Sequence, residues 1–583
     1  MDRRSFLLSS TALLALGNCT VVFDKQDAFE RSKHCNTANL AKAKELTVDI
    51  HCHLLNTTDT NGPAFVARHM MNIPEDGVTR DLLNFASRFL PNVKREKSRL
   101  IDILKDWSNH EDKTPDQNMR EDLCIPAYAR HKYPLGKILQ NLHFEGFLSS
   151  RIKNAADLMM TFPEVHMFVP SMVDFYEGTG RDANAGYDPI EAVRFYSALN
   201  LATNGRFLPM VSFSPERQYD EEIYGQATDG LNHKRPLDLI RWAIEELGFV
   251  GVKLHPSTGF SPIENQKYAC LNTEDQKADI HPPPADEVQR RFIRYDEIMM
   301  ELFLLCAELD VPILTHGSRG IMANDFCMTH KRPGNAQGAT FTYHPLDKDN
   351  MWVDEVELEW TNSPKTWIKA MKAAQKAIAA HPDLNGRTLR VCLGHLAGGF
   401  KRRPNRVGKP EYQGHKVETH PVSKTEWLTC MIDKLGKTPG LYFDLSNQGY
   451  LFEDLDPTSP ARSPKMYPNA RAAFGALSAE PGFAQRAMYG TDWHMPGPSK
   501  VSGSYQAEIR RALYPYARSG AMGENALRFL GLNSGGTTRA RLEQFYARPP
   551  GAIFDTDVNA ADRYEMAVNL AAVPWWNASG GIP

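Results

Sequence analysis

The strongest constraint on the fold is an alternation of short apolar runs with amphipathic helical stretches that occurs eight times along the chain. Several runs are nearly continuous in Val, Ile, Leu and Phe, which is typical of parallel strands covered on both faces. The runs span residues 46–53, 165–175, 206–213, 249–256, 311–317, 389–396, 441–446 and 487–494. Eight strands with interleaved helices predict an α/β fold of the (β/α)8 TIM-barrel type.

Helical periodicity appears between these runs, where apolar residues recur every three or four positions. The expected helices span residues 188–201, 236–247, 287–309, 367–380, 425–435 and 469–477. Their order, each between two apolar runs, supports parallel pairing of the strands that they connect.

Two connections, residues 54–164 and 318–387, are far longer than a plain strand-to-helix turn. They follow strands 1 and 5 at the barrel face where active sites lie, so we expect lids and specificity elements rather than separate domains. The predicted organisation is a barrel over 45–532 followed by a C-terminal extension over 533–583.

The charge balance indicates which partners the chain has. A net charge of -3 and an isoelectric point near 6.7 offer no electrostatic footprint for nucleic acid. The basic run Lys401, Arg402 and Arg403 lies in a predicted loop rather than along a helix. We therefore expect a small-molecule substrate and no binding of nucleic acid.

The first 25 residues have the features of an export signal, with Arg3 and Arg4 followed by Phe6, Leu7 and a short apolar stretch. This pattern resembles a twin-arginine signal, the route that carries folded proteins, and predicts a location in the periplasm or cell envelope. A general secretory signal is the alternative.

Cys19 leaves open whether the exported protein is free or lipid-anchored, although Asn18 is a poor residue directly before a lipidated cysteine. The nine cysteines include no Cys-x-x-Cys pair, so a structural zinc site is not expected. Disulfide pairing cannot be assigned from the sequence alone.

The first strand ends in His51 and His53, and the two-residue period of a strand turns both imidazoles to one face. Lys253, His316, His395 and Asp492 also lie at strand ends. Because a parallel barrel brings all its strand ends into one mouth, these six side chains are expected to meet there. A single strand-end histidine would more often be a hydrogen-bonded core residue, so the argument depends on the whole set.

The order His-x-His, Lys, His, His, Asp resembles the amidohydrolase superfamily, in its branch that also holds decarboxylases and lactonases. The motifs that carry the resemblance are His51-Cys52-His53, Gly251-Val252-Lys253-Leu254-His255-Pro256, Thr315-His316-Gly317, Gly394-His395-Leu396-Ala397-Gly398-Gly399 and Tyr489-Gly490-Thr491-Asp492-Trp493. Residues 523–532 are similar to the closing helix of that branch. The resemblance covers residues 46–532 as scattered motifs, while the insertions and the tail have no recognised counterpart.

This set of residues predicts a metal-dependent hydrolase that cleaves an amide, ester or lactone bond. Histidines 51, 53 and 316 with Asp492 are the expected ligands of a divalent ion, most simply zinc, which lowers the pKa of a bound water. We expect Asp492 to accept the proton of that water and His395 to polarise the scissile carbonyl. A metal-dependent decarboxylase on the same site is one alternative, and a catalytically silent envelope binding protein is another.

The number of metals depends on Lys253. If its amine is carbamylated, it bridges two metals, and His316 and His395 then bind the second ion, as the resemblance to dihydroorotase implies. We predict the one-metal arrangement, in which Lys253 is a structural or substrate-binding cation. His255 and Arg319 are the further candidates for substrate binding, and the run from Lys401 offers additional cations.

Overall fold

A computed structural model describes seventeen segments of the chain. They are residues 45–56, 59, 92–108, 150–174, 188–224, 235–256, 260–268, 285–317, 329–331, 340–342, 362–402, 422–448, 451, 466–493, 503–514, 520–554 and 567–579. The export signal with Cys19, as well as Arg319 and Arg403, lies outside these described residues.

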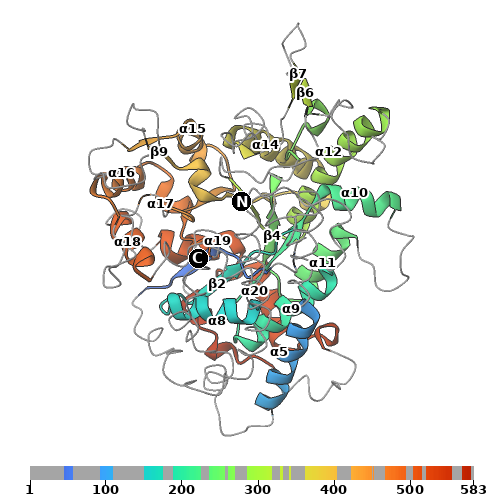
Figure 1. Cartoon of the computed structure of the whole chain (residues 1–583), viewed down its shortest axis with the longest axis vertical. Coiled ribbons are helices and arrows are strands. Elements are labelled where there is room, and N and C mark those ends of the chain that lie inside the picture. The colour runs from blue at the N-terminus through green and yellow to red at the C-terminus, as the bar shows by residue number, and fades with distance from the viewer. Residues whose placement is uncertain are drawn as a thin grey trace, which may run out of the picture.

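Eight parallel strands form the centre of the described structure (Figure 1). They are β1 (Val48–Cys52), β2 (Met167–Pro170), β3 (Met210–Phe213), β4 (Gly251–Leu254), β5 (Ile313–Thr315), β8 (Val391–Leu393), β11 (Leu441–Asp444) and β12 (Ala487–Met488). Each lies inside one of the predicted apolar runs, so all eight predicted strands are confirmed. The strands are shorter than the runs because the residues near the run ends leave the hydrogen-bonded ladder.

Two parallel sheets are joined into a ring by isolated bridges. Six of the strands are hydrogen-bonded in the order β12-β11-β8-β5-β4-β3, and β1 pairs with β2. A parallel bridge between Ser171 and Met210 links β2 to β3, and another between Cys52 and Trp493 links β1 to the segment after β12. The predicted TIM barrel is confirmed, and all its strand ends meet at one mouth.

Helices cover the outside of this ring, and the six predicted helices are all confirmed to within a few residues. They are α9 (Pro189–Ala202), α11 (Pro236–Glu246), α12 (Ala285–Glu308), α14 (Pro364–Ala380), α15 (Glu426–Leu435) and α16 (Pro468–Ser478). Side-chain caps begin several of them: Ser363 accepts the Thr366 N–H, and Thr425 accepts the Leu428 N–H. Helices α10 (Pro215–Tyr224) and α17 (Phe483–Arg486) also lie between strands, and α18 (Gly503–Leu513) and α19 (Asn525–Leu530) follow β12.

The described part of the insertion after β1 contains α5 (Val93–Ser108) and α8 (Arg151–Thr161). Helix α5 packs against α9 of the barrel. The buried guanidinium of Arg151 binds the carboxylates of Asp59 and Glu96. The α5–α9 contact joins the insertion to the barrel wall, whereas the ion pairs of Arg151 join α8 to α5 and to Asp59 within the insertion.

Two short antiparallel hairpins lie in the connections after β5 and β8. The first pairs β6 (Thr329–Lys331) with β7 (Thr340–Thr342), and the second pairs β9 (Phe400–Arg402) with β10 (Val422–Lys424). Both connections leave the barrel at its carboxyl-terminal face, the face that carries the predicted site.

The C-terminal residues pack against the far end of α9. Tyr546 lies in α20 (Thr537–Ala547), and its hydroxyl donates to Asn200 Oδ1 at 2.9 Å. Further along the chain, the Trp575 indole donates to the Gly205 carbonyl at 2.7 Å. Gly205 has φ +72°, and a Cβ there would lie 2.7 Å from the Tyr546 hydroxyl oxygen, so this contact requires glycine. Helix α22 (Trp576–Ser579) is the last of the described helices. None of the described helices combines the length and apolar character needed to cross a bilayer.

Candidate active site

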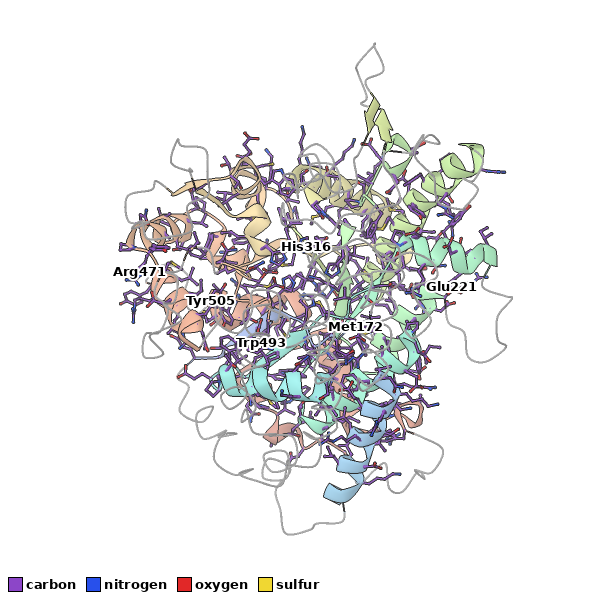
Figure 2. The ribbon with its side chains drawn as sticks, in the orientation of Figure 1. Met172, Glu221, His316, Arg471, Trp493 and Tyr505 are labelled. Atoms are coloured by element: carbon purple, nitrogen blue, oxygen red, sulfur yellow. The ribbon has the colours of Figure 1, made fainter. Side chains whose placement is uncertain are left out.

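The predicted site residues lie at the carboxyl ends of five strands. His51 and Lys253 are the penultimate residues of β1 and β4, and His316 directly follows β5. His395 begins the short helix η7 (His395–Gly398) after β8, and Asp492 follows β12. Figure 2 shows His316 near the middle of the molecule, over the central strands. All of these side chains are buried except that of His316, which is half-buried.

Five imidazoles form a closed ring at this mouth. In the order His51, His53, His255, His316, His395 and back to His51, neighbouring ring centroids are 5.2, 6.1, 5.8, 4.5 and 4.8 Å apart. The structure therefore brings together every histidine that the sequence analysis selected.

Asp492 contacts this ring from one side. Its Oδ1 lies 3.4 Å from Nε2 of His53 and 3.7 Å from Nε2 of His51, and its Oδ2 lies 3.8 Å from Nδ1 of His395. The Asp492 backbone is in the left-handed region with φ 56°, and its N–H donates to the His51 carbonyl at 2.7 Å. Burial raises the pKa of the Asp492 carboxyl.

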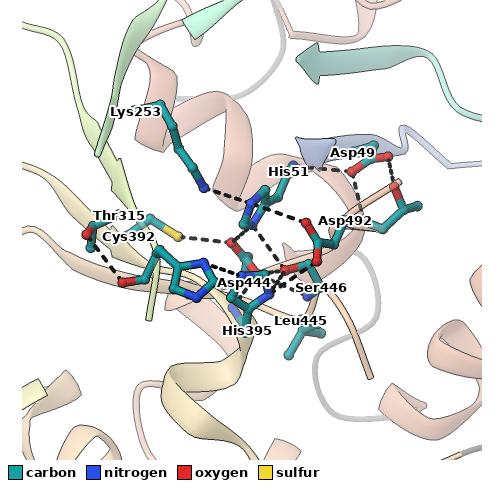
Figure 3. Close-up of polar contacts among 12 residues, drawn as sticks. Asp49, His51, Lys253, Thr315, Cys392, His395, Asp444, Leu445, Ser446 and Asp492 are labelled. Carbon is teal, nitrogen blue, oxygen red and sulfur yellow. Dashed lines mark hydrogen bonds and ion pairs between the residues drawn. The ribbon is translucent and has the colours of Figure 1, made fainter. Parts of the chain in front are cut away.

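The hydrogen bonds of His51 and His53 define which ring nitrogen carries the proton. Nδ1 of His51 lies 2.9 Å from the Asp444 carboxylate (Figure 3). Nδ1 of His53 lies 3.1 Å from the Ser171 carbonyl. Because both partners accept hydrogen bonds, each Nδ1 must donate, which leaves the Nε2 lone pair of both rings available. Burial, and then the nearby Lys253 charge, lowers the pKa of His51 and favours its neutral form.

This donor set fits a divalent metal ion. Among the described residues, His51, His395 and Asp492 form one group whose ligand atoms all lie within 4.8 Å of one another. Neutral imidazole nitrogen and carboxylate oxygen are the ligands that zinc and similar ions take in catalytic sites. His53 adds a further imidazole through its contact with Asp492.

His316 is not part of the three-residue group, and its Nδ1 lies 3.0 Å from Nε2 of His395. His395 lies beside His51 and Asp492. Its expected roles, polarising the substrate or binding a second metal, stay predictions. The ligand role of His316 stays a prediction.

Lys253, on β4, points at His51. Its Nζ lies 2.7 Å from Nε2 of His51, and the side chain is fully buried. Burial lowers the pKa of Lys253 to about 8, against the opposing pull of Asp444 and Asp492. The lowered pKa increases the share of the neutral amine, which is the form that carbamylation needs.

Two functional candidates were missed by the sequence analysis, Asp444 at the end of β11 and Ser446 two residues later. Both are fully buried, and both contact the predicted histidines (Figure 3). The signal was available, because Asp444 and Ser446 repeat at the end of strand 7 the two-residue spacing that selected His51 and His53.

The predicted substrate-binding residues fall in two groups. His255 is buried as one of the five histidines that form the ring, and burial lowers its pKa well below the usual range. Arg319 lies outside the described residues. Of the basic run, Lys401 and Arg402 belong to β9, and the structure describes only their backbone.

A sequence model described as amidohydrolase matches residues 216–532. No curated protein matches the chain. A solved structure of 5-carboxyvanillate decarboxylase from Sphingomonas paucimobilis is 12% identical with a TM-score of 0.32, over 74% of this chain and 95% of that one.

Two further solved structures are similar at the same level. The IDCase of Metarhizium anisopliae is 15% identical with a TM-score of 0.30, over 66% of this chain and 79% of that one. A 5-carboxyvanillate decarboxylase from Novosphingobium aromaticivorans, with bound manganese and 3-methoxy-4-hydroxy-5-nitrobenzoic acid, is 12% identical with a TM-score of 0.32 over 74% and 92%. The activities and ligands in these names belong to those proteins.

Proposed function

The chain belongs to the amidohydrolase family, and we propose that it is a hydrolase that uses a divalent metal ion to cleave an amide, ester or lactone bond. The observation that carries this proposal is the position of Asp492. Its two carboxylate oxygens face three imidazoles from different strands, His51, His53 and His395. One carboxylate is therefore placed both to share the metal with these imidazoles and to accept a proton beside it.

The residues proposed to hold the metal are His51, His53, Asp492 and either His395 or His316. Zinc is the simplest ion for this mixture of imidazole and carboxylate. When bound, such an ion lowers the pKa of a coordinated water towards neutrality and so supplies a nucleophile at physiological pH.

The protein groups would carry the proton and orient the substrate. Asp492 accepts the proton from the attacking water through one carboxylate oxygen and returns it to the leaving group. His395, whose Nδ1 lies 3.8 Å from Asp492 Oδ2, is close enough to polarise the scissile carbonyl or to stabilise the oxyanion that forms from it. His255, a buried member of the ring of five histidines, is proposed to contact the substrate.

A hydrolase and a decarboxylase differ in their products, and this difference provides the test. Metal-loaded protein is screened against lactones, N-acyl amino acids and aromatic carboxylates in water labelled with oxygen-18. We expect label in the carboxylate product of a turned-over lactone, ester or amide. Carbon dioxide release with no label in any product would replace the hydrolase proposal by decarboxylation. Metal-loaded protein that turns over no member of any class would support a binding protein.

We also propose export through the twin-arginine route, with the metal loaded before transport. Arg3 and Arg4 are the residues that this route requires, so a double replacement with lysine should retain the protein in the cytoplasm. Cell fractionation measures the location, and unchanged export of the lysine variant would favour the general secretory route. Mass spectrometry of the exported form decides whether Cys19 carries lipid.

A further inference from the structure

The buried pair Asp444 and Ser446 lies beside His51 and His395 (Figure 3). Asp444 ends β11, and its side chain is fully buried among groups from three strand ends. Neither residue belongs to the proposed ligand set. Their hydrogen bonds nevertheless reach two members of it, His51 and His395.

The five hydrogen bonds of Asp444 connect three strand ends. Oδ2 accepts from Nδ1 of His51 at 2.9 Å and from the Cys392 thiol at 3.8 Å. Oδ1 accepts from the Ser446 hydroxyl at 2.5 Å and from the backbone N–H groups of His395 and Ser446, both at 3.0 Å. His395 has a left-handed backbone with φ 56°, so the bond to its N–H holds a conformation that histidine rarely adopts.

The Ser446 hydroxyl extends this arrangement to a second imidazole. Because its proton is donated to Asp444, its oxygen is left to accept from ring N–H groups. Ser446 Oγ lies 3.0 Å from Nδ1 of His395 and 3.1 Å from Nδ1 of His51. Both rings are thereby held with the proton on Nδ1 and the lone pair on Nε2.

We propose that Asp444 and Ser446 are positioning residues that hold His51 and His395 with the proton on Nδ1 and the lone pair on Nε2. For His51, this is the tautomer that can bind a metal through Nε2. A ring that carries its proton on Nε2 cannot ligate through that atom, so the pair controls whether the imidazole ligands are competent. This inference rests on the proposed metal-dependent function and adds to it the residues that prepare the ligands.

Asp444→Asn is the sharpest test because it changes the chemistry without changing the shape. The three donors to Oδ1 keep the amide oxygen at that position, which turns the new NH₂ group towards Nδ1 of His51. Nδ1 must then accept, and the ring proton moves to Nε2. We expect zinc affinity, measured by competition with a chromophoric chelator, to fall about 10–100-fold.

A second readout reports the tautomer in the metal-free protein. Nitrogen-15 spectra of histidine-labelled protein distinguish rings protonated on Nδ1 from rings protonated on Nε2. Relative to wild type, Asp444→Asn should convert one of the 19 histidines from the first class to the second. Ser446→Ala removes the acceptor of His395 Nδ1 and should shift the tautomer balance of that ring while leaving the Asp444–His51 bond intact.

Asp49→Asn is the matched control, since Asp49 is an equally buried carboxylate that contacts His51 only through its backbone N–H. It should leave the zinc affinity and the ring spectra near the wild-type result. A folded Asp444→Asn protein with wild-type affinity and spectra overturns the inference. If that variant does not fold, unchanged spectra in Ser446→Ala overturn it instead. Wild type that binds no zinc defeats the proposed function, while the metal-free spectra still test the pair.

Discussion

The Nζ atom of Lys253 lies 2.7 Å from Nε2 of His51, the same ring nitrogen that would ligate a metal. The ammonium group therefore donates to the lone pair that metal binding would use, and it must move or change its chemical form when the ion binds. This relationship makes Lys253 the residue that separates a one-metal site from a two-metal site.

We expect Lys253→Ala to retain one metal per chain. In the one-metal arrangement Lys253 contributes a substrate-binding cation, so the variant should raise KM more than it lowers kcat. Elemental analysis gives the metal content, and steady-state kinetics separate the two constants. A wild-type content of two metals, halved in the variant and with activity restored by added formate or acetate, would show instead that Lys253 is a bridging carbamate.

Removal of the metal should abolish turnover reversibly. We expect a chelator to eliminate activity and added zinc to restore it, because the proposed nucleophile depends on the ion. The double variant His51→Ala, His53→Ala should bind no metal at metal concentrations that saturate the wild-type protein. Purified wild-type protein that contains no metal after expression in supplemented medium contradicts the account.

Asp492→Asn should separate catalysis from metal binding. The amide oxygen retains a weak ligand but cannot accept the proton, so kcat should fall about 10²–10⁴-fold while most of the metal stays bound. Metal content and kcat are measured on the same preparation. A variant with near-normal kcat would remove Asp492 from the role of proton acceptor.

The buried ion pairs of Arg151 should contribute strongly to the stability of the fold. Arg151 is fully buried against Asp59 and Glu96, so Arg151→Met leaves two carboxylates without their cation and should cost about 3–5 kcal/mol. The control is Arg241→Met, which breaks a pair with Glu308 that is about half-exposed and should cost at most about 1 kcal/mol. Chemical denaturation compares the two variants, and equal losses would show that the buried network stabilises the fold no more than an exposed ion pair does.

His166 should make the protein less stable in acid. Burial, aided by Arg206 and Arg510 and opposed by Glu164, lowers the pKa of His166 to about 4. Between pH 6.5 and pH 4 the unfolded chain binds a proton that the folded chain does not, so the free energy of unfolding falls as the pH falls.

His166→Asn should remove about 1–3 kcal/mol of this acid-dependent loss, because asparagine does not titrate and its oxygen can replace Nδ1 as acceptor of the Thr47 N–H. Denaturation midpoints at pH 7 and pH 5 measure the effect. Parallel pH profiles for wild type and variant would show that other groups cause the acid sensitivity.

Much of the fold could be predicted because its signals are local. The apolar runs, the caps at Ser363 and Thr425 and the helical periodicity each depend on neighbouring residues, and all eight strands and six helices were found from them. The strand bounds were overestimated because apolar residues continue past the ladder into the buried ends of each strand. Asp444 was missed because the sequence identifies its strand but does not show which side chain its carboxylate contacts.

The sequence by itself determined which side chains stand at the strand ends, since a two-residue period and a run of apolar residues specify the face and the end of a strand without reference to the rest of the chain. Only the tertiary structure decided which of them meet. The ring of strands places His395 rather than His316 in the group with His51 and Asp492, and it brings the Asp444 carboxylate to Nδ1 of His51 from 393 residues away. Such distances follow from the closure of the barrel, and no local pattern in the sequence encodes them.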